Sequence, residues 1–299
     1  MLWVDVFTEY DGEKEAVEEV LDIKLLSKEE AQEIESSSKY FETESGIVAN
    51  LNFIERNRDK LTVEPISFVV TDDGILVSIR HTDCDVFTET ARRIQIEKDK
   101  NSSGFDIFVI LTEAHIDREA DMVELMAAQI SQLSQEISES DRIGKYIIKK
   151  ISQLQEQIIT LRENIFDLQR VLISIRRSAR FPQKLQHRLQ LILKDIDSLI
   201  NHSDFSFQRL DSLQDTALGL INIEQNEIVK ILSVAAVVFM PPTLVASLYG
   251  MNFKYMPELD WEMTLQSGAI VPLGYIFAIT LMLIFSVLTL WFFKYKKWL

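Results

Sequence analysis

Two uncharged apolar runs near the C-terminus constrain this chain more than any other feature of its sequence. They cover residues 231–250 and 270–293, and neither contains Asp, Glu, Lys or Arg. At ~1.5 Å rise per residue, roughly 20 and 24 helical residues reach about 30 and 36 Å, enough to cross the hydrocarbon core of a bilayer. The sequence therefore predicts two transmembrane helices.

The charges that flank the two runs predict their orientation. Lys230 precedes the first run, and the basic tail "KYKKWL" at 294–299 follows the second. The linking segment 254–269 carries one lysine and three carboxylates. Because Lys and Arg are retained on the cytoplasmic side, we expect both termini in the cytoplasm and the loop outside, in a cell inner (plasma) membrane.

The rest of the chain is strongly acidic. The whole sequence carries a net charge of −15, and residues 230–299 hold five lysines against three carboxylates, which leaves −17 for residues 1–229. Nucleic-acid binding needs basic surface, so this balance argues against it and is compatible with metal cations as partners. Neither G-x-G-x-x-G nor a P-loop is found, and the histidines lack H-E-x-x-H spacing; we expect no nucleotide and no enzyme activity.

Residues 1–115 are typical of an α/β domain, which we expect in the cytoplasm. The strand candidates are "WVDVF", "GIVANLNFIE", "LTVEPISFVV" and "GILVSIRH". The last two flank Asp72-Asp73-Gly74, a hairpin signal. "FDIFVILTEAH" is compatible with a strand or with the start of a helix, and segments near 13–25 and 87–98 have helical composition.

Residues 116–230 have the spacing of long helices. Apolar residues alternate intervals of four and three, as in a heptad seam: Met126, Ile130, Leu133, Ile137, then Ile147, Ile151, Leu154, Ile158, Leu161, Ile165, Leu168, Leu172 and Ile175. Pro182 interrupts the seam, which resumes at Leu185. The pattern predicts two long helices folded back on each other, the second continuing as a stalk into the first membrane span.

A polar stripe runs along this second helix. Asp215, Asn222, Asn226 and Ser233 recur at intervals of 7, 4 and 7, within about 40° of one face at ~100° per residue. On a lone helix this stripe would be ordinary amphipathicity. The hydroxyl and small residues of the first apolar run, with its Pro241-Pro242 pair, suit either a packed dimer interface or a pore wall. Two helices cannot enclose an aqueous path, so a pore requires a closed ring of copies.

The C-terminal third resembles a known family. "INIEQNEIVKILSVAAVVFMPPTLVASLYGMNFKYMPELDW" at 221–261, followed by a second span and a basic tail, resembles the CorA family of magnesium transporters. Its signature is the Gly-Met-Asn tripeptide that ends the first span, here 250–252, together with the MPEL loop, here 256–259. The close match covers 221–299, and the N-terminal part is similar only in architecture.

The resemblance implies a fold and a function. The fold is a homopentameric funnel: an α+β domain (1–115), a long helical hairpin and stalk (116–230), a pore-lining helix (231–253), an outer loop (254–269), a second transmembrane helix (270–293) and a cytoplasmic tail (294–299). The function is influx of Mg²⁺, and of Co²⁺ and Ni²⁺, down the electrochemical gradient, closed by cytoplasmic Mg²⁺ bound between subunits. The alternatives are a Zn²⁺ transporter of the same superfamily or a membrane-anchored helical scaffold.

The resemblance also implies roles for individual residues. The ion entrance and selectivity set is Gly250, Met251, Asn252 and Glu258. The pore-lining and gate set is Asp215, Asn222, Asn226, Val229, Leu232 or Ser233, Ala236, Met240, Thr243 and Ser247. For the regulatory metal the candidates are Glu55, Asp195 and Asp197, because Leu191 stands where relatives have an acid on the stalk helix.

Overall fold

The computed structural model divides the chain into two compact units, Met1–Ala217 (unit 1) and Leu218–Leu299 (unit 2). We describe each unit by itself. The structure describes residues 2–7, 12–33, 35, 38–57, 60–96, 103–140, 144–252, 254–264 and 270–296.

Unit 1 contains a five-stranded sheet in the order β1-β5-β4-β3-β2. The strands are β1 (Trp3–Phe7), β2 (Tyr40–Thr43), β3 (Gly46–Asn57), β4 (Lys60–Thr71) and β5 (Leu76–Arg80). The pair β1–β5 is parallel, and the other pairs are antiparallel. The predicted hairpin is confirmed: Gly74 adopts φ +79° between β4 and β5, a conformation that glycine tolerates best.

Side chains alternate between the two faces of the sheet along each strand, and apolar residues are buried on both faces. One face, with Leu51 and Phe53 of β3, belongs to the main core; Val48 belongs to a smaller core on the other face, with Leu25. Three short helices accompany the sheet: α1 (Glu13–Leu21), α2 (Lys28–Glu33) and α3 (Asp85–Ile96).

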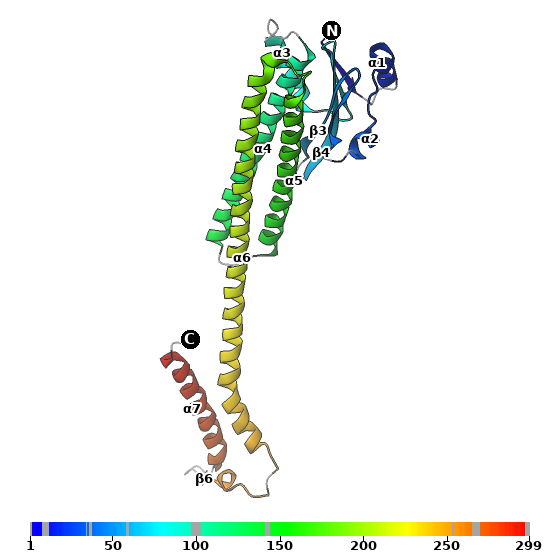
Figure 1. The fold of residues 1–299 in the computed structure, drawn as a ribbon. Helices are drawn as coiled ribbons and strands as arrows, with labels where there is room; N and C mark the ends of the chain where they lie inside the picture. Colours follow the sequence, from blue (N-terminus) through cyan, green and yellow to red (C-terminus); the bar gives the residue numbers. More distant parts are fainter. Residues whose placement is uncertain are drawn as a thin grey trace. The chain divides into compact units, whose positions relative to one another are not determined.

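Three long helices, rather than the predicted two, follow the sheet. They are α4 (Gly104–Glu139), α5 (Lys145–Arg177) and α6 (Gln186–Tyr249), with a short 3₁₀ helix, η2 (Gln183–Leu185), before the last. The prediction was wrong because the heptad phase continues across residues 140–144, where the chain leaves α4 and begins α5. Figure 1 shows α4 and α5 side by side next to β3 and β4.

The segment "FDIFVILTEAH" forms the first turns of α4, so this helix begins before the expected boundary at 115. Residues 104–112 are all buried, which explains why their apolar run has no helical periodicity. The predicted seam itself is confirmed: its members from Met126 to Ile175 are all buried in the main core.

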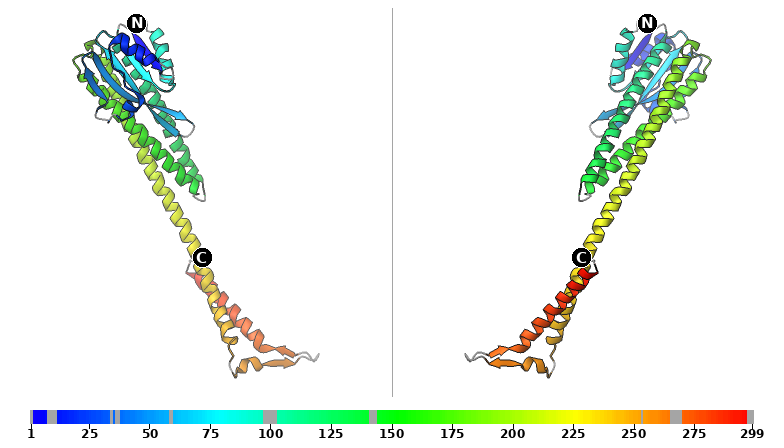
Figure 2. Two further views of the ribbon diagram at one scale, coloured as in Figure 1. Left: turned by 90° about the vertical axis from the view of Figure 1, so that its right-hand side faces the viewer. Right: turned by 90° about the vertical axis from the view of Figure 1, so that its left-hand side faces the viewer.

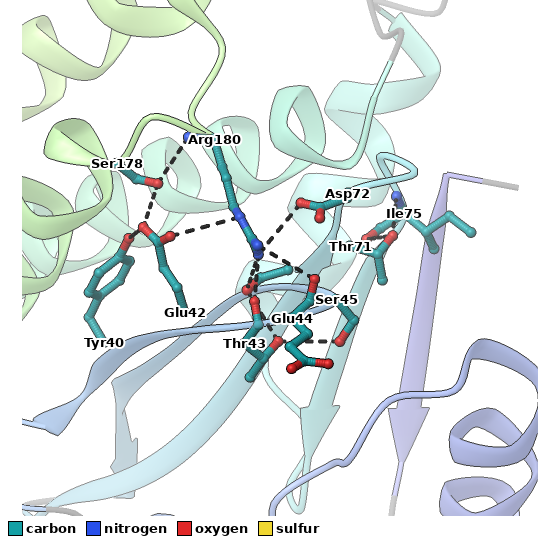
Figure 3. A network of polar contacts seen from close by, with 11 residues as sticks. Tyr40, Glu42, Thr43, Glu44, Ser45, Thr71, Asp72, Ile75, Ser178 and Arg180 are labelled. Carbon is teal, nitrogen blue, oxygen red and sulfur yellow. Dashed lines mark hydrogen bonds and ion pairs between the residues drawn. The ribbon is translucent and has the colours of Figure 1, made fainter.

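The turn between α5 and α6 is fixed to the sheet by Arg180 (Figure 3). Its Nη1 donates to the carbonyl oxygens of Thr43 (2.7 Å) and Gly46 (2.9 Å). The same guanidinium lies near the carboxylates of Glu42 (3.8 Å) and Asp72 (3.6 Å). The guanidinium thereby supplies donors to carbonyl groups at the β2–β3 turn.

Unit 2 contains the rest of α6, the 3₁₀ helix η3 (Pro257–Asp260), the strands β6 (Glu262–Thr264) and β7 (Ile270–Pro272), and α7 (Leu273–Tyr295). The helix that ends at Tyr249 and α7 are both long and apolar enough to cross a membrane. Figure 2 shows η3 and the β6–β7 hairpin at the N-terminal end of α7. This hairpin corrects the expected start of the second span at 270, because residues 270–272 pair with β6.

Candidate functional site

The predicted pore-lining residues of unit 2 lie along one side of α6, and all of them are exposed in the single chain. At ~100° per residue, Asn222, Asn226 and Ser233 lie within about 20° of a common line. On the same scale Met240 lies about 20° from this line, Val229 and Ser247 about 40°, Ala236 about 60°, Thr243 about 80° and Leu232 about 100°. Asp215 belongs to unit 1, where it is also exposed.

A different side of α6 is covered by the chain itself. Val245 is buried, and it lies more than about 100° around the helix from the polar line. Met240 on the polar side is 65% exposed. The surface that this chain leaves uncovered on its first apolar helix therefore includes the amide and hydroxyl side chains.

The proline pair lies inside α6 without ending it. Pro241 and Pro242 have no amide N–H, so the carbonyls of Val237 and Val238 lose their usual donors four residues ahead. The Thr243 hydroxyl donates to the carbonyl of Phe239 (2.7 Å). The carbonyls of Val237 and Val238 and the Thr243 hydroxyl each keep an oxygen lone pair that can accept a hydrogen bond near the level of Met240.

The Gly-Met-Asn tripeptide ends α6 without a left-handed residue. The Gly250 amide donates to Ala246 O (2.9 Å), and the Met251 amide to Leu248 O (3.3 Å). In the described part of the chain, positive φ occurs only at Gly12, Asp22 and Gly74. Glycine and asparagine both tolerate a left-handed helix cap, but this tripeptide does not form one.

The structure gives a different reason for glycine at position 250. A Cβ added to Gly250 would lie 3.0 Å from the Ala246 carbonyl oxygen, closer than side chains normally approach. Glycine therefore keeps the last turn of α6 tight. Gly250, Met251 and Asn252 are all exposed, so their polar atoms face outward from the end of the helix.

The acidic loop is attached to the start of α7. Glu258 and Asp260 lie on η3, directly before Trp261. The Trp261 carbonyl accepts the amides of Leu273 (2.9 Å) and Gly274 (3.4 Å), which belong to the first turn of α7. The Trp261 ring packs edge-on against Phe277, with 5.9 Å between the ring centroids. Sequence reasoning missed this arrangement, although Pro257 at the first position of η3 was an available signal.

The three regulatory candidates are not brought together within one chain. Glu55, on β3, accepts a bond from the Cys84 thiol (3.0 Å) and lies 4.0 Å from Arg118. Asp195 and Asp197 are exposed on α6, and Asp197 accepts a bond from an α5 glutamine side chain. Among the residues that the structure describes, no group of three or more His, Cys, Asp or Glu side chains is arranged to hold a metal ion.

The architecture and the exposed polar stripe define a class, a membrane transporter with two C-terminal apolar helices. The family model described as "CorA-like Mg2+ transporter protein" matches residues 1–296. The chain therefore belongs to the CorA family.

Individual relatives resemble the chain over its full length. The magnesium transport protein CorA of Wolinella succinogenes is 31% identical over 304 residues, 100% of this chain and 91% of the relative. That of Campylobacter jejuni strain RM1221 is 34% identical over 312 residues, with the same coverage. The complete structure of the CorA magnesium transporter from Methanocaldococcus jannaschii has the same fold, with a TM-score of 0.80 at 17% identity over 99% of this chain and 91% of that one.

Proposed function

We propose that this chain forms a Mg²⁺ channel in which α6 from each copy lines a shared aqueous axis. The observation that carries the proposal is the uncovered set of hydroxyl residues Ser233, Thr243 and Ser247 on an uncharged span that ends in Gly-Met-Asn, in line with the exposed Asn222 and Asn226 before the span. In lipid an exposed hydroxyl is unfavourable, so these side chains need water or another copy opposite them. A closed ring meets this need, and the family resemblance supports five copies.

The outer entrance consists of neutral oxygens. The last carbonyls of α6 and the amide oxygen of Asn252 point outward from the helix end. Mg²⁺ gives up its water ligands reluctantly, so a ring of such oxygens holds a hydrated ion through hydrogen bonds to its waters. Glu258 and Asp260 on η3 raise the local concentration of cations.

Below the entrance the stripe changes in character. Thr243 and Ser247 present hydroxyls, whereas Met240 with Ala236, Val229 and Leu232 forms an apolar section that closes by excluding water. Ser233 lies within this apolar section, and further along the rings of Asn226, Asn222 and Asp215 provide amide and carboxylate oxygens toward the cytoplasm. This arrangement places the apolar gate between two polar sections.

The membrane potential drives the ion inward. At ~2.3 kcal/mol per charge per 100 mV, a divalent cation gains about 4.6 kcal/mol on entering a negative interior. Orientation in the inner membrane with both termini in the cytoplasm follows from the flanking lysines. The same path accepts Co²⁺ and Ni²⁺, whose hydrated ions also carry two positive charges.

Cytoplasmic Mg²⁺ closes the channel by bridging carboxylates of adjacent copies. Residues 1–229 carry a charge of −17, so like charges facing across a subunit boundary repel until cations bind. Glu55, Asp195 and Asp197 are the proposed ligands, and each metal site combines carboxylates from two adjacent copies. A ring whose symmetry is the same in chelator and in millimolar Mg²⁺ contradicts this regulation.

The test is Mg²⁺ influx into liposomes that contain the purified full-length protein. Asn252→Ala is expected to reduce influx to background while the assembly keeps its size, because the variant removes one amide oxygen from each copy. Asn201→Ala is the matched control, an exposed asparagine of α6 in unit 1. Normal influx in Asn252→Ala refutes the entrance assignment.

Two further measurements distinguish the alternatives. Competition among Mg²⁺, Zn²⁺ and cobalt(III) hexammine identifies the ion that the entrance accepts. The hexammine complex cannot exchange its ligands, so inhibition by it indicates an entrance that binds a fully hydrated ion. A monomeric protein without single-channel current supports a membrane-anchored scaffold in place of a channel.

A further inference from the structure

A cluster of buried polar side chains lies where β3, α4 and α5 meet in unit 1. His115 and Glu119 are one turn apart on α4, and Asn164 is on α5. Their exposed fractions are 1%, 0% and 4%. A carboxyl group is rarely buried to this extent unless a cation or several donors compensate it, so its protonation state has to be explained.

Asn164 connects the three elements. Its Nδ2 donates to Glu119 Oε1 and to the backbone carbonyl of Asn52 on β3 (3.1 Å). The backbone of Asn52 also bonds the His115 ring, which stacks on Phe53 with 3.9 Å between ring centroids. The positions of the imidazole and the carboxyl are therefore set by contacts from both neighbouring elements.

Two buried atoms of this cluster have no hydrogen-bond partner within the described residues, His115 Nε2 and Glu119 Oε2. The bond to Asn52 occupies the other ring nitrogen as a donor, which leaves Nε2 as an acceptor. His115 Nε2 lies 3.5 Å from Glu119 Oε1, the oxygen that also accepts the bond from Asn164. A protonated Oε1 has one O–H to donate and keeps a lone pair for the Asn164 amide, and the imidazole has one lone pair to accept the hydrogen bond.

No cation is directed at this carboxyl from the described parts of the elements around it. Arg118 of α4 lies 3.5 Å from Asp85 and 4.0 Å from Glu55, and its buried Nε has no partner among the described residues. Arg93 of α3 pairs with Glu89 and Asp117, and Lys39, before β2, pairs with Asp167. An ionised Glu119 would therefore be a buried charge with one amide donor as its compensation.

We propose that Glu119 and His115 form a buried proton-binding site in unit 1, in which the carboxylic acid of Glu119 donates its single proton to His115 Nε2. The ligand is one proton, and its loss leaves a carboxylate facing an imidazole lone pair. That arrangement is repulsive, so deprotonation weakens the contact of α4 with α5 and β3. The site links the packing of unit 1 to pH, independently of ion passage through unit 2.

The electrostatic environment is consistent with this geometry. Burial raises the pKa of Glu119 to about 8, against the opposing effect of the Asn164 bond. Burial lowers the pKa of His115 to about 3, although the bond to Asn52 acts in the other direction. At neutral pH both side chains are uncharged, and deprotonation of Glu119 begins just above it.

Infrared spectroscopy of the full-length protein in D₂O tests the site directly. We expect the spectrum of the wild type minus that of Glu119→Gln to show one protonated-carboxyl band at pH 7, which disappears as pH rises through about 8. Glu113→Gln is the matched control: this α4 glutamate accepts two bonds from Arg188 (2.6 and 2.5 Å), so its removal leaves the band in place. Absence of the band at pH 7 overturns the proposal.

Thermal unfolding across pH gives an independent readout. A folded-state pKa above the unfolded value contributes stability at low pH that is lost as pH rises to the folded pKa. We therefore expect the Tm of the wild type to fall relative to Glu119→Gln from pH 4.5 to about 8 and then to stay parallel to it. His115 is present in both proteins, and its lowered pKa affects stability only below pH 6.5.

A difference in Tm that is independent of pH overturns the proposal. If Glu119→Gln does not fold, the wild-type band decides by itself, since its loss on raising pH requires a carboxyl group that is protonated at pH 7. Measuring Mg²⁺ influx of the same protein at one pH distinguishes this site from the channel. A variant with a channel defect loses influx but keeps the infrared titration of Glu119.

Discussion

The two units use similar aliphatic helices in opposite ways. In unit 1, the apolar seam of α5 is buried from Ile147 to Ile175 between α4, α6 and the sheet. In unit 2, large apolar side chains remain uncovered, with Leu244 68% and Leu283 61% exposed. Unit 1 has three long helices and a sheet with which to cover its apolar surface, whereas unit 2 has two helices and a short hairpin.

This difference shows which unit the chain can complete alone. Unit 1 buries its apolar side chains away from water within one chain, so its stability depends on the free energy of that burial. The many uncovered large apolar side chains of unit 2 are typical of a surface that contacts lipid or another protein. The predictions below compare matched substitutions in these two settings.

Removing the same atoms from the two units should have very different effects. Leu172→Ala deletes a side chain that is fully buried in the main core, and we expect it to lower the free energy of unfolding of unit 1 by about 2–5 kcal/mol. Leu283→Ala, on the exposed surface of α7, should leave the unfolding of unit 1 unchanged. Circular dichroism of the purified protein during heating measures both; equal losses contradict the distinction between the units.

The turn between α5 and α6 provides a polar test of unit 1. Arg180→Met leaves the carbonyls of Thr43 and Gly46 without their guanidinium donor, so we expect a loss of roughly 1–3 kcal/mol in unfolding free energy. Arg177→Met, at the exposed end of α5, is the control and should have little effect. A loss in Arg177→Met as large as in Arg180→Met shows that general charge, not this bond network, fixes the turn.

A small change in unit 2 should reduce transport without unfolding the protein. Gly250→Ala places a Cβ 3.0 Å from Ala246 O, which loosens the last turn of α6 and displaces the entrance oxygens. If about 1.4 kcal/mol of the strain appears in the barrier to passage, influx falls about tenfold. Gly219→Ala is the control, because nothing lies within 4 Å of its added Cβ. Unchanged influx in Gly250→Ala contradicts the role given to the tight turn.

Much of the fold could be predicted because it depends on local pattern. The strand candidates in the sequence correspond to β1, β3, β4 and β5, and the Asp-Asp-Gly turn identified the β4–β5 hairpin. The spacing of Ile and Leu identified the buried side of α5. The sequence did not reveal the end of α4 before α5, since the heptad phase is preserved across 140–144. It also did not reveal β7, because an apolar strand of three residues cannot be distinguished from the start of an apolar helix.

The candidate site was predictable in part for the same reason. Spacing alone placed Asn222, Asn226 and Ser233 on one side of a helix. The sequence did not reveal the reason for Gly250, which is the nearby Ala246 carbonyl and not a left-handed turn. The attachment of the acidic loop through the Trp261 carbonyl depends on a contact between two segments, which no spacing rule contains.

The sequence by itself determined the two apolar spans, the acidic character of the rest, the buried seam and the polar line along α6. These properties depend on residue type and on helical or strand periodicity. Only the tertiary structure decided which surfaces cover one another, and it brought His115, Glu119 and Asn164 together from two helices beside β3. Periodicity fixes the direction in which a side chain points, whereas the group that it meets depends on packing between segments far apart in the chain.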